Sequence, residues 1–166
     1  MIGRVQGLDE ARITRIACGH FHMMALQEDG NIWAWGLGED GRLGAGKETS
    51  HDRPVKVLTR NFRKESPVVK IFCGGSHSLA LTDDGQLYTW GRGEEGQLGL
   101  PRIAAGSLKH PAVWQPTKVQ TLSGKQIFQV ACGANHTAAL IVTGARFVKQ
   151  SSDGIFHRLY YGEVRP

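Results

Sequence analysis

The most constraining feature of this sequence is a long stretch that occurs twice. Residues 16–45 read IACGHFHMMALQEDGNIWAWGLGEDGRLGA, and residues 71–100 read IFCGGSHSLALTDDGQLYTWGRGEEGQLGL. Equivalent positions are always 55 apart (73 − 18 = 99 − 44 = 55), so the two align without a gap. A weaker third repeat begins near residue 130, at a further offset of 59 (132 − 73). Self-similarity at a fixed long period indicates a repeat architecture, which has to be interpreted before any single motif.

The repeats share a set of cysteine, glycine, histidine and tryptophan positions. These are Cys18, Gly19, His22, Gly30, Trp35, Gly36, Gly41 and Gly44 in the first, Cys73, Gly74, His77, Gly85, Trp90, Gly91, Gly96 and Gly99 in the second, and Cys132, Gly133, His136 and Gly144 in the third. The third repeat then departs from the pattern, because Lys149 and Gln150 stand where tryptophan and glycine are expected. We interpret the shared positions as a structural signature.

Each repeat predicts short β-strands and no helix. The first repeat has apolar, partly β-branched runs at 15–17, 22–27 and 32–35, and the second has the equivalent runs at 68–72, 78–82 and 87–90. Equivalents of the first two runs lie at 126–131 and 137–142 in the third repeat. The Asp-Gly pairs at 29–30 and 84–85 favour hairpin turns, since glycine supplies the positive φ that such turns need. Pro-x-x-Val segments at 54–57 and 116–119 predict a fourth strand that begins at its proline; residues 2–5 lack only the proline. Four antiparallel strands per unit predict an all-β fold of β-propeller blades.

Composition supports a globular chain. At 166 residues the chain is long enough for one domain with a core, and its 22 glycines are roughly double the usual share of about 7%, as expected for many tight turns. No apolar run approaches the roughly 20 residues that span a bilayer, and no secretory segment is evident. The three cysteines stand at one equivalent position, which predicts buried thiols rather than disulfides and an intracellular, cytoplasmic or nuclear location.

The pattern C-G-x-x-H-x-x-A-L-x-x-D-G, followed by W-G-x-G-x-x-G-[QR]-L-G, resembles the repeat of the regulator of chromosome condensation family. The resemblance is strong over 16–46 and 71–101 and weaker over 119–144. It implies blades of a seven-bladed propeller, so the chain would be a single partial domain with two full repeats, 5–56 and 57–118, and a degenerate third, 119–166. We expect either a fragment of a longer protein or a short chain that completes its ring by self-association.

Two motifs invite a chemical interpretation that the repeats disfavour. The G-x-G-x-x-G segments at 36–41 and 91–96 fit a dinucleotide loop, but Leu-Gly pairs break any following helix and the carboxylates inside the loop repel phosphate. The Cys-x-x-x-His pairs lie one to a repeat, so no four ligands or nucleophile-base pair converge. We expect the thiols to pack and the imidazoles to bond backbone near a strand start. The sequence therefore predicts no catalytic residues, no metal and no cofactor.

The irregular spacers, 47–65 and 102–124, are where recognition would lie, because loops on a rigid scaffold carry binding. The candidate interaction residues are Arg53, Arg60, Arg63, Lys64 and Trp114. Each of them also fits an ordinary solvated or packed side chain, and the tryptophans as a group predict blade core. The net charge of +5 is moderate.

The interpretation of function is a non-catalytic protein-interaction scaffold. Through the resemblance, one alternative is a regulator that acts like a guanine-nucleotide exchange factor on a small GTPase, and another is an adaptor that contacts chromatin or nucleic acid. The family's exchange residues lie outside the repeat motif, so none carries over to a position here.

Overall fold

The computed structural model describes residues 4–58, 60, 62, 66–101, 112–125, 127–141, 146–150 and 156–158. Gly144 of the repeat signature and the candidates Arg63 and Lys64 lie outside these residues. In the part of the chain that is described, no helix is long and apolar enough to cross a membrane.

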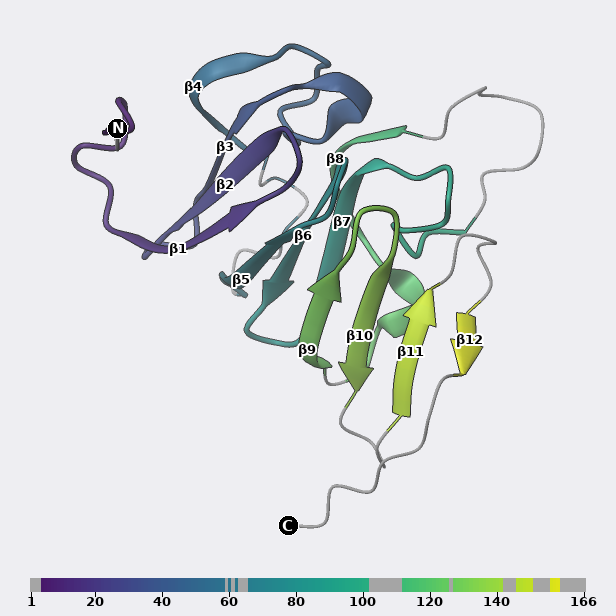
Figure 1. Ribbon diagram of the computed structural model, residues 1–166. Helices are drawn as coiled ribbons and strands as arrows, with labels where there is room; N and C mark the ends of the chain where they lie inside the picture. The colour runs from purple at the N-terminus through teal and green to yellow at the C-terminus, as the bar shows by residue number, and fades with distance from the viewer. Residues whose placement is uncertain are drawn as a thin grey trace.

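The described residues form three four-stranded antiparallel sheets (Figure 1). Sheet A contains β1 (Ile13–Cys18), β2 (His22–Gln27), β3 (Ile32–Gly36) and β4 (His51–Lys56); sheet B contains β5 (Val68–Cys73), β6 (His77–Thr82), β7 (Leu87–Arg92) and β8 (Ala112–Lys118); sheet C contains β9 (Ile127–Cys132), β10 (Thr137–Ile141), β11 (Arg146–Gln150) and β12 (Phe156–Arg158). The strands of each sheet follow chain order. This arrangement confirms the predicted all-β fold class of four-stranded blades.

The Asp-Gly pairs form the hairpin turns that the sequence predicts. Gly30 has φ +85° and its N–H donates to the Gln27 carbonyl at 2.9 Å, which closes the turn between β2 and β3. In sheet B, Gly85 repeats this geometry with φ +78° and a 3.0 Å bond to Thr82. The turns fix the register, so that Ala25 pairs with a tryptophan across the hairpin of sheet A.

The fourth strands begin earlier than predicted. β4 starts at His51 and β8 at Ala112, so Pro54 and Pro116 lie inside these strands instead of at their first residues. Both strands are sheet edges, where the side of the strand without a neighbour tolerates a residue that has no N–H. At the N-terminus, Val5 is outside any strand, so the described part of segment 2–5 does not match the expected fourth-strand pattern.

Sheet C forms although its third strand lacks the expected tryptophan and glycine. Lys149, at the tryptophan position, pairs with Ala138 on β10 and with His157 on β12. Strand pairing depends on backbone N–H and C=O groups, which every residue except proline supplies. The signature side chains are therefore not required for a third four-stranded sheet.

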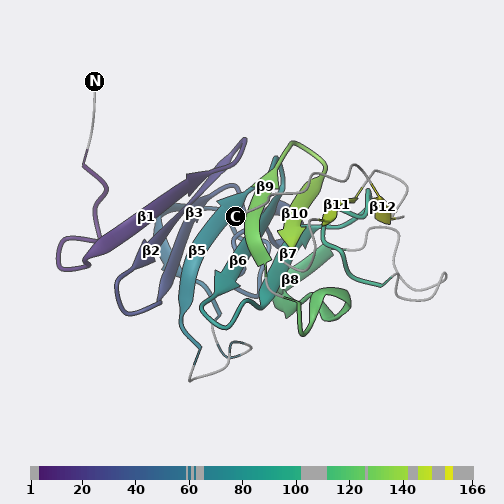
Figure 2. The same ribbon diagram turned by 90° about the horizontal axis from the view of Figure 1, so that it is seen from below.

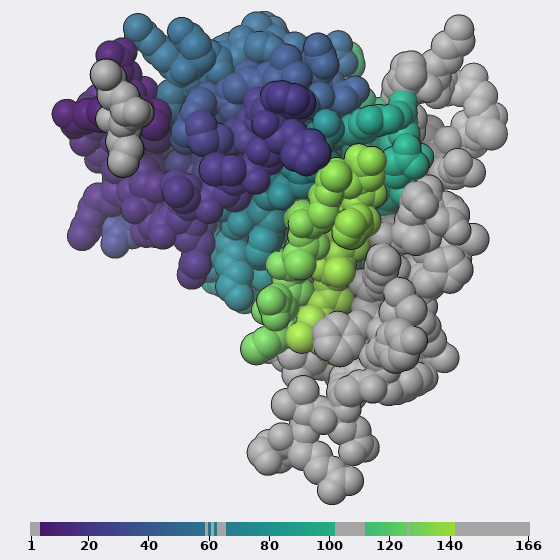
Figure 3. Space-filling model, viewed as in Figure 1, coloured from purple at the N-terminus to yellow at the C-terminus, as the bar shows by residue number. Residues whose placement is uncertain are grey.

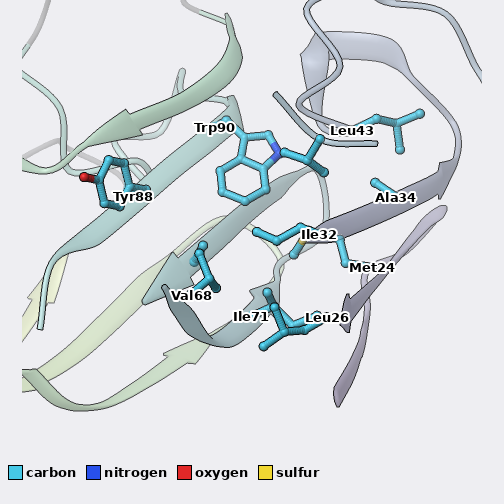
Figure 4. Packing of buried hydrophobic residues seen from close by; sticks show 11 residues of the cluster. Met24, Leu26, Ile32, Ala34, Leu43, Val68, Ile71, Tyr88 and Trp90 are labelled. Carbon is cyan, nitrogen blue, oxygen red and sulfur yellow. The ribbon is translucent and has the colours of Figure 1, made fainter. Parts of the chain in front are cut away.

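The three sheets pack face to face in the order A, B, C (Figure 2). The first core cluster joins A to B and consists of Met24, Leu26, Ile32, Ala34, Leu43, Val57, Val68, Ile71, Ala80, Tyr88 and Trp90 (Figure 4). The second joins B to C and consists of Leu79, Leu81, Leu87, Val119, Leu122, Ile127, Val130, Ala139 and Ile141. A valine directly follows the last residue of each fourth strand, β4 and β8. Both valines are buried in the core clusters. Alternation along β6 sends Ala80 to one cluster and Leu79 to the other.

Candidate interaction site

The repeat histidines connect neighbouring sheets. The His22 Nε2 atom lies 2.8 Å from the Ser78 hydroxyl, and this hydroxyl donates its proton to the Arg42 carbonyl at 2.8 Å. Since the serine proton is used on the carbonyl, Nε2 of the imidazole must be the donor to Ser78 Oγ. In this arrangement a histidine of one sheet bonds a hydroxyl of the next sheet, and the hydroxyl bonds a loop carbonyl. We call it the histidine joint.

The joint is repeated between sheets B and C. Here His77 Nε2 lies 3.0 Å from the Thr137 hydroxyl, which donates to the Gln97 carbonyl at 2.9 Å. These three residues are equivalent to those of the first joint at offsets of 55 and 59. The expectation that the imidazoles bond backbone near a strand start is therefore wrong for His22 and His77: each ring reaches across to a side-chain hydroxyl of the next sheet.

Burial keeps these imidazoles neutral. Desolvation, followed by the charge of the Arg42 guanidinium, lowers the pKa of His22 from 6.5 to about 4. Desolvation, followed by the nearby His136, lowers the pKa of His77 from 6.5 to about 4 as well. Neutral rings at pH 7 match a joint in which each imidazole donates a single hydrogen bond.

The glycine after each signature cysteine makes room for the imidazole. A Cβ on Gly74 would lie 1.9 Å from Cε1 of His77, and a Cβ on Gly19 would lie 2.4 Å from Cε1 of His22. The same conflict arises at Gly133, at 2.1 Å from the ring of His136. No side chain fits at such distances, so the Cys-Gly-x-x-His motif is explained by packing.

The other signature glycines in the described residues all have positive φ. They are Gly30, Gly36, Gly41, Gly44, Gly85, Gly91, Gly96 and Gly99. Gly36 ends β3 and Gly91 lies in β7, and the rest lie in turns and loops. In the first G-x-G-x-x-G loop, which contains the 3-10 helix η1 (Glu39–Gly41), the Gly41 N–H donates to the Gly38 carbonyl and the Gly44 N–H donates to the Gly41 carbonyl. N–H groups that bond within the turn cannot also bind a phosphate. The loop geometry thus supports a turn between strands.

Trp90 adds a further bond between sheets A and B. Its indole Nε1 donates to the Arg42 carbonyl at 3.1 Å, so this carbonyl accepts from Ser78 and Trp90 together. The Arg42 guanidinium, 4% exposed, lies 3.1 Å from the Asp40 carboxylate. In sheet A the equivalent Trp35 is only half-buried.

The cysteines are free thiols, but they differ in burial. Cys73 and Cys132 are partly covered, and burial raises the pKa of both, that of Cys132 to about 12. Cys18 is exposed, so the prediction of three buried thiols is wrong at this position. The physical reason is that sheet A covers the strand of Cys73 and sheet B covers that of Cys132, whereas the face of sheet A that carries Cys18 has no sheet against it among the described residues.

Two of the candidate interaction residues lie at strand β8, one on it and one bonded to it. The Arg60 guanidinium donates to Oε1 of Gln115, the neighbour of Trp114, at 2.7 Å. Trp114 is 46% exposed, so it stands apart from the blade core that is expected of the tryptophans as a group. Arg53 lies exposed on β4, with no bond to this pair recorded in the described residues. We call Arg60, Trp114 and Gln115 the rim site.

The rim site is held by contacts with sheet A. The Gly46 N–H donates to the Trp114 carbonyl at 2.9 Å, and a Cβ on Gly41 would lie 2.7 Å from Trp114 Cα. The Arg60 segment is anchored by Phe62, whose ring meets that of Tyr88 edge to face at 4.6 Å between centroids. The Trp114 side chain therefore packs in part against Gly41 of the sheet A loop and is otherwise exposed.

Sequence reasoning missed the hydroxyl partners Ser78 and Thr137. One signal was available: both stand directly after the signature histidine, and both carry a hydroxyl. Met23 occupies that position in the first repeat, which hid the pattern. In the described residues, no group of three or more histidine, cysteine or acidic side chains is arranged to hold a metal ion.

The chain matches a known protein family. The model of the regulator of chromosome condensation (RCC1) repeat matches residues 29–81 and 84–140, and a second model of the same description matches 13–42 and 68–97. The chain belongs to the RCC1 repeat family. The resemblance stated from the sequence is thereby confirmed, and the three sheets are RCC1-type sheets.

Relatives and solved structures agree with the family. The chain is 37% identical over 145 residues to human probable E3 ubiquitin-protein ligase HERC6, covering 86% of this chain and 13% of that protein. It superposes on human WBSCR16 with a TM-score of 0.76 at 23% identity, over 95% of this chain and 40% of the other. For Prp20p of Saccharomyces cerevisiae the TM-score is 0.68 at 25% identity, over 87% and 32%. The chain thus spans well under half the length of each.

Proposed function

We propose that this chain is a non-catalytic protein-interaction scaffold whose rim site contacts the partner. The observations that carry the proposal are the 46% exposed indole of Trp114 and the exposed Arg60, whose guanidinium bonds the next residue of β8, Gln115. Tryptophan and arginine are the residue types most enriched among the side chains that dominate binding energy at interfaces.

The repeat does not account for the rim site. The residue of sheet A that is equivalent to Trp114 is Asp52, counted from Pro54 and Pro116, and Gln115 corresponds to Arg53. The signature residues, in contrast, are used in contacts within and between sheets, as the histidine joints show. The indole packs in part against Gly41, but its exposed part is an aromatic surface on a rigid scaffold outside the repeat pattern, which fits a role in recognition.

Site-specific photo-crosslinking tests this proposal. A photoreactive phenylalanine analogue at Trp114 is expected to crosslink discrete proteins in cell extract, and Arg60→Ala in the same chain should reduce the yield about tenfold. The matched control carries the analogue at Phe128, which is 61% exposed on sheet C. The same crosslinked bands from both positions, or an undiminished yield after Arg60→Ala, would contradict a role of the rim site.

A second candidate is regulation of a small GTPase by nucleotide exchange. It is supported by Prp20p, whose binding to Gsp1p and histones was described with its crystal structure. We expect release of a fluorescent GDP analogue from a responsive GTPase to accelerate at micromolar concentrations of the chain. If none of a panel of small GTPases releases nucleotide faster, the exchange function is excluded while crosslinking from the rim site still tests the scaffold.

A further inference from the structure

The spacer that leads from sheet A to sheet B is longer than the one that leads from B to C. From the buried valine to the signature cysteine it spans 16 positions, against 13 in the next repeat (73 − 57 = 16, 132 − 119 = 13). The apolar anchors of the spacers show where the extra residues lie. Leu122 follows its valine by 3 positions and Phe62 by 5 (122 − 119 = 3, 62 − 57 = 5). Arg60 therefore lies in the extended part of the spacer.

The longer spacer is also more basic. In sequence, 58–67 contains Arg60, Arg63 and Lys64 against the single carboxylate of Glu65, whereas 120–126 contains one lysine and no acidic residue. Both spacers are anchored to their core cluster by an apolar side chain. The packing of the sheets thus does not account for the additional positive charge.

The Arg60 guanidinium is positioned without being neutralised. Carboxylates pair with several other arginines of the described chain, namely Arg4, Arg12, Arg42 and Arg92. Arg60 instead donates to the neutral amide oxygen of Gln115, and no carboxylate pairs with it among the described residues. A guanidinium carries five N–H donors in a planar fork that matches a carboxylate. The bond to Gln115 leaves most of these donors free for an anion.

Strand β8, which Arg60 contacts, belongs to sheet B, and this sheet lies between A and C (Figure 3). Its backbone is not open to a partner at this point. The Trp114 carbonyl accepts from the loop of sheet A at 2.9 Å, and the Gln115 carbonyl accepts from the Thr117 hydroxyl at 3.1 Å. Pro116 has no N–H. Because an added strand needs free N–H and C=O groups, recognition here depends on side chains.

The charges on the neighbouring outer strand disfavour nucleic acid as the ligand. Strand β4 carries an exposed Asp52 at the position equivalent to Trp114, and Glu48 is exposed in the loop before it. Duplex nucleic acid binds by contacting many phosphates, so it requires a row of cations. Carboxylates on the next strand interrupt such a row. A short acidic segment needs only the local positive charge at Arg60.

We propose that the rim site binds an acidic segment of a partner protein, with a side-chain carboxylate on the Arg60 guanidinium that Gln115 positions. This inference rests on the proposed function, because it names the class of partner that the rim site binds. A hydrogen bond between two charged groups is about twice as strong as one between neutral groups, and the planar fork gives it direction. The site therefore favours a carboxylate over an uncharged polar group.

Peptide display on the full chain tests the chemistry of the partner. Random short peptides selected for binding are expected to be rich in aspartate and glutamate, and Arg60→Glu should weaken the selected peptides at least about tenfold. Arg53→Glu is the matched control, because it makes the same charge change at an exposed arginine of β4 outside the rim site. Selected peptides without acidic residues, or equal losses in both variants, would overturn the proposal.

Gln115→Glu tests the charge separately from the shape of the site. Glutamate has nearly the same size as glutamine, but it neutralises Arg60 from within the chain while Trp114 stays in place. The affinity of the acidic peptides should fall about fivefold or more, as fluorescence anisotropy can measure. Unchanged affinity in a variant whose circular dichroism spectrum matches the wild type would count against a carboxylate on Arg60.

The results distinguish this inference from the proposed function. Uncharged peptides that depend on Arg60 and compete with crosslinking from Trp114 would leave the rim site as a binding site and refute only the acidic class. Duplex DNA that binds more tightly than any selected peptide, with a loss in Arg60→Glu but not in Arg53→Glu, would refute it as well. If no selected peptide depends on Arg60 and crosslinking yields no discrete partner, both proposals fail.

Discussion

His22 and His77 show how single residues adapt to the sheet contacts. Each ring donates one hydrogen bond through Nε2, while Nδ1 has no partner in the described residues. A second proton would put a charge into a site that excludes water. Because burial lowers both pKa values to about 4, the folded state binds fewer protons than the unfolded state between pH 6.5 and 4.

Stability should therefore fall in acid. The contribution of these histidines is complete above pH 6.5 and is lost as the pH falls towards 4, by about 2 kcal/mol for each between pH 7 and pH 5. Urea denaturation at a series of pH values measures this loss. His22→Gln and His77→Gln together should lower stability at pH 7 and flatten its pH dependence; a profile as steep as that of the wild type would show that other groups cause the acid response.

The second strand of each sheet is the element that connects sheets. In β6, Ser78 receives the histidine of sheet A, Leu79 packs towards sheet C, and Ala80 packs towards sheet A. The alternation of side chains along one strand thus serves two contacts at once. The hydroxyl position also tolerates threonine, which is the residue found in β10.

The joint predicts a contrast between two substitutions. Ser78→Ala leaves Nε2 of His22 and the Arg42 carbonyl with fewer partners in a buried site and should cost about 1–3 kcal/mol. Ser78→Thr keeps the hydroxyl and should cost less, as Thr137 shows in the next sheet. Chemical denaturation measures both. Equal losses for alanine and threonine would mean that packing, and not the hydroxyl, determines the effect.

At the scale of the whole molecule, stability is a sum of sheets and of the contacts between them. The two core clusters share sheet B but have no residue in common. Nearest-neighbour packing of this kind is typical of repeat proteins, in which the damage from a substitution spreads only to adjoining units. The backbone amides of sheet A should then remain protected from hydrogen exchange when the contact between sheets B and C is weakened.

Hydrogen exchange can detect this independence. Leu79→Ala removes a fully buried side chain from the second cluster and should cost about 2–5 kcal/mol. Exchange is expected to rise in β9 and β10, while β2 and β3 keep most of their protection. Met24→Ala, in the first cluster, is the matched control and should give the reverse pattern. Uniform loss across all sheets in both variants would indicate a single cooperative unit.

Much of the fold could be predicted from the sequence because its cause is local. The Asp-Gly turns at Gly30 and Gly85 and the strands β2 and β6 that precede them follow from backbone preferences of neighbouring residues. The histidine partners could not be predicted in this way. His22 and Ser78 are 56 residues apart, and only sheet packing brings them together.

The rim site was predicted in part. Arg60 and Trp114 were both candidates, but the contacts of Arg60 with Gln115 and of Trp114 with the sheet A loop at Gly41 and Gly46 depend on packing. Their role in binding stays a prediction.

By itself, the sequence determined the repeat, its strands and the family, since these depend on residue order at a fixed period. Only the tertiary structure decided which of three equivalent positions are covered. Ile16 and Ile71 have the same side chain and the same place in the repeat, yet one is exposed and the other buried. Burial depends on which sheet lies alongside, and that is a property of the packed molecule, not of the local chain.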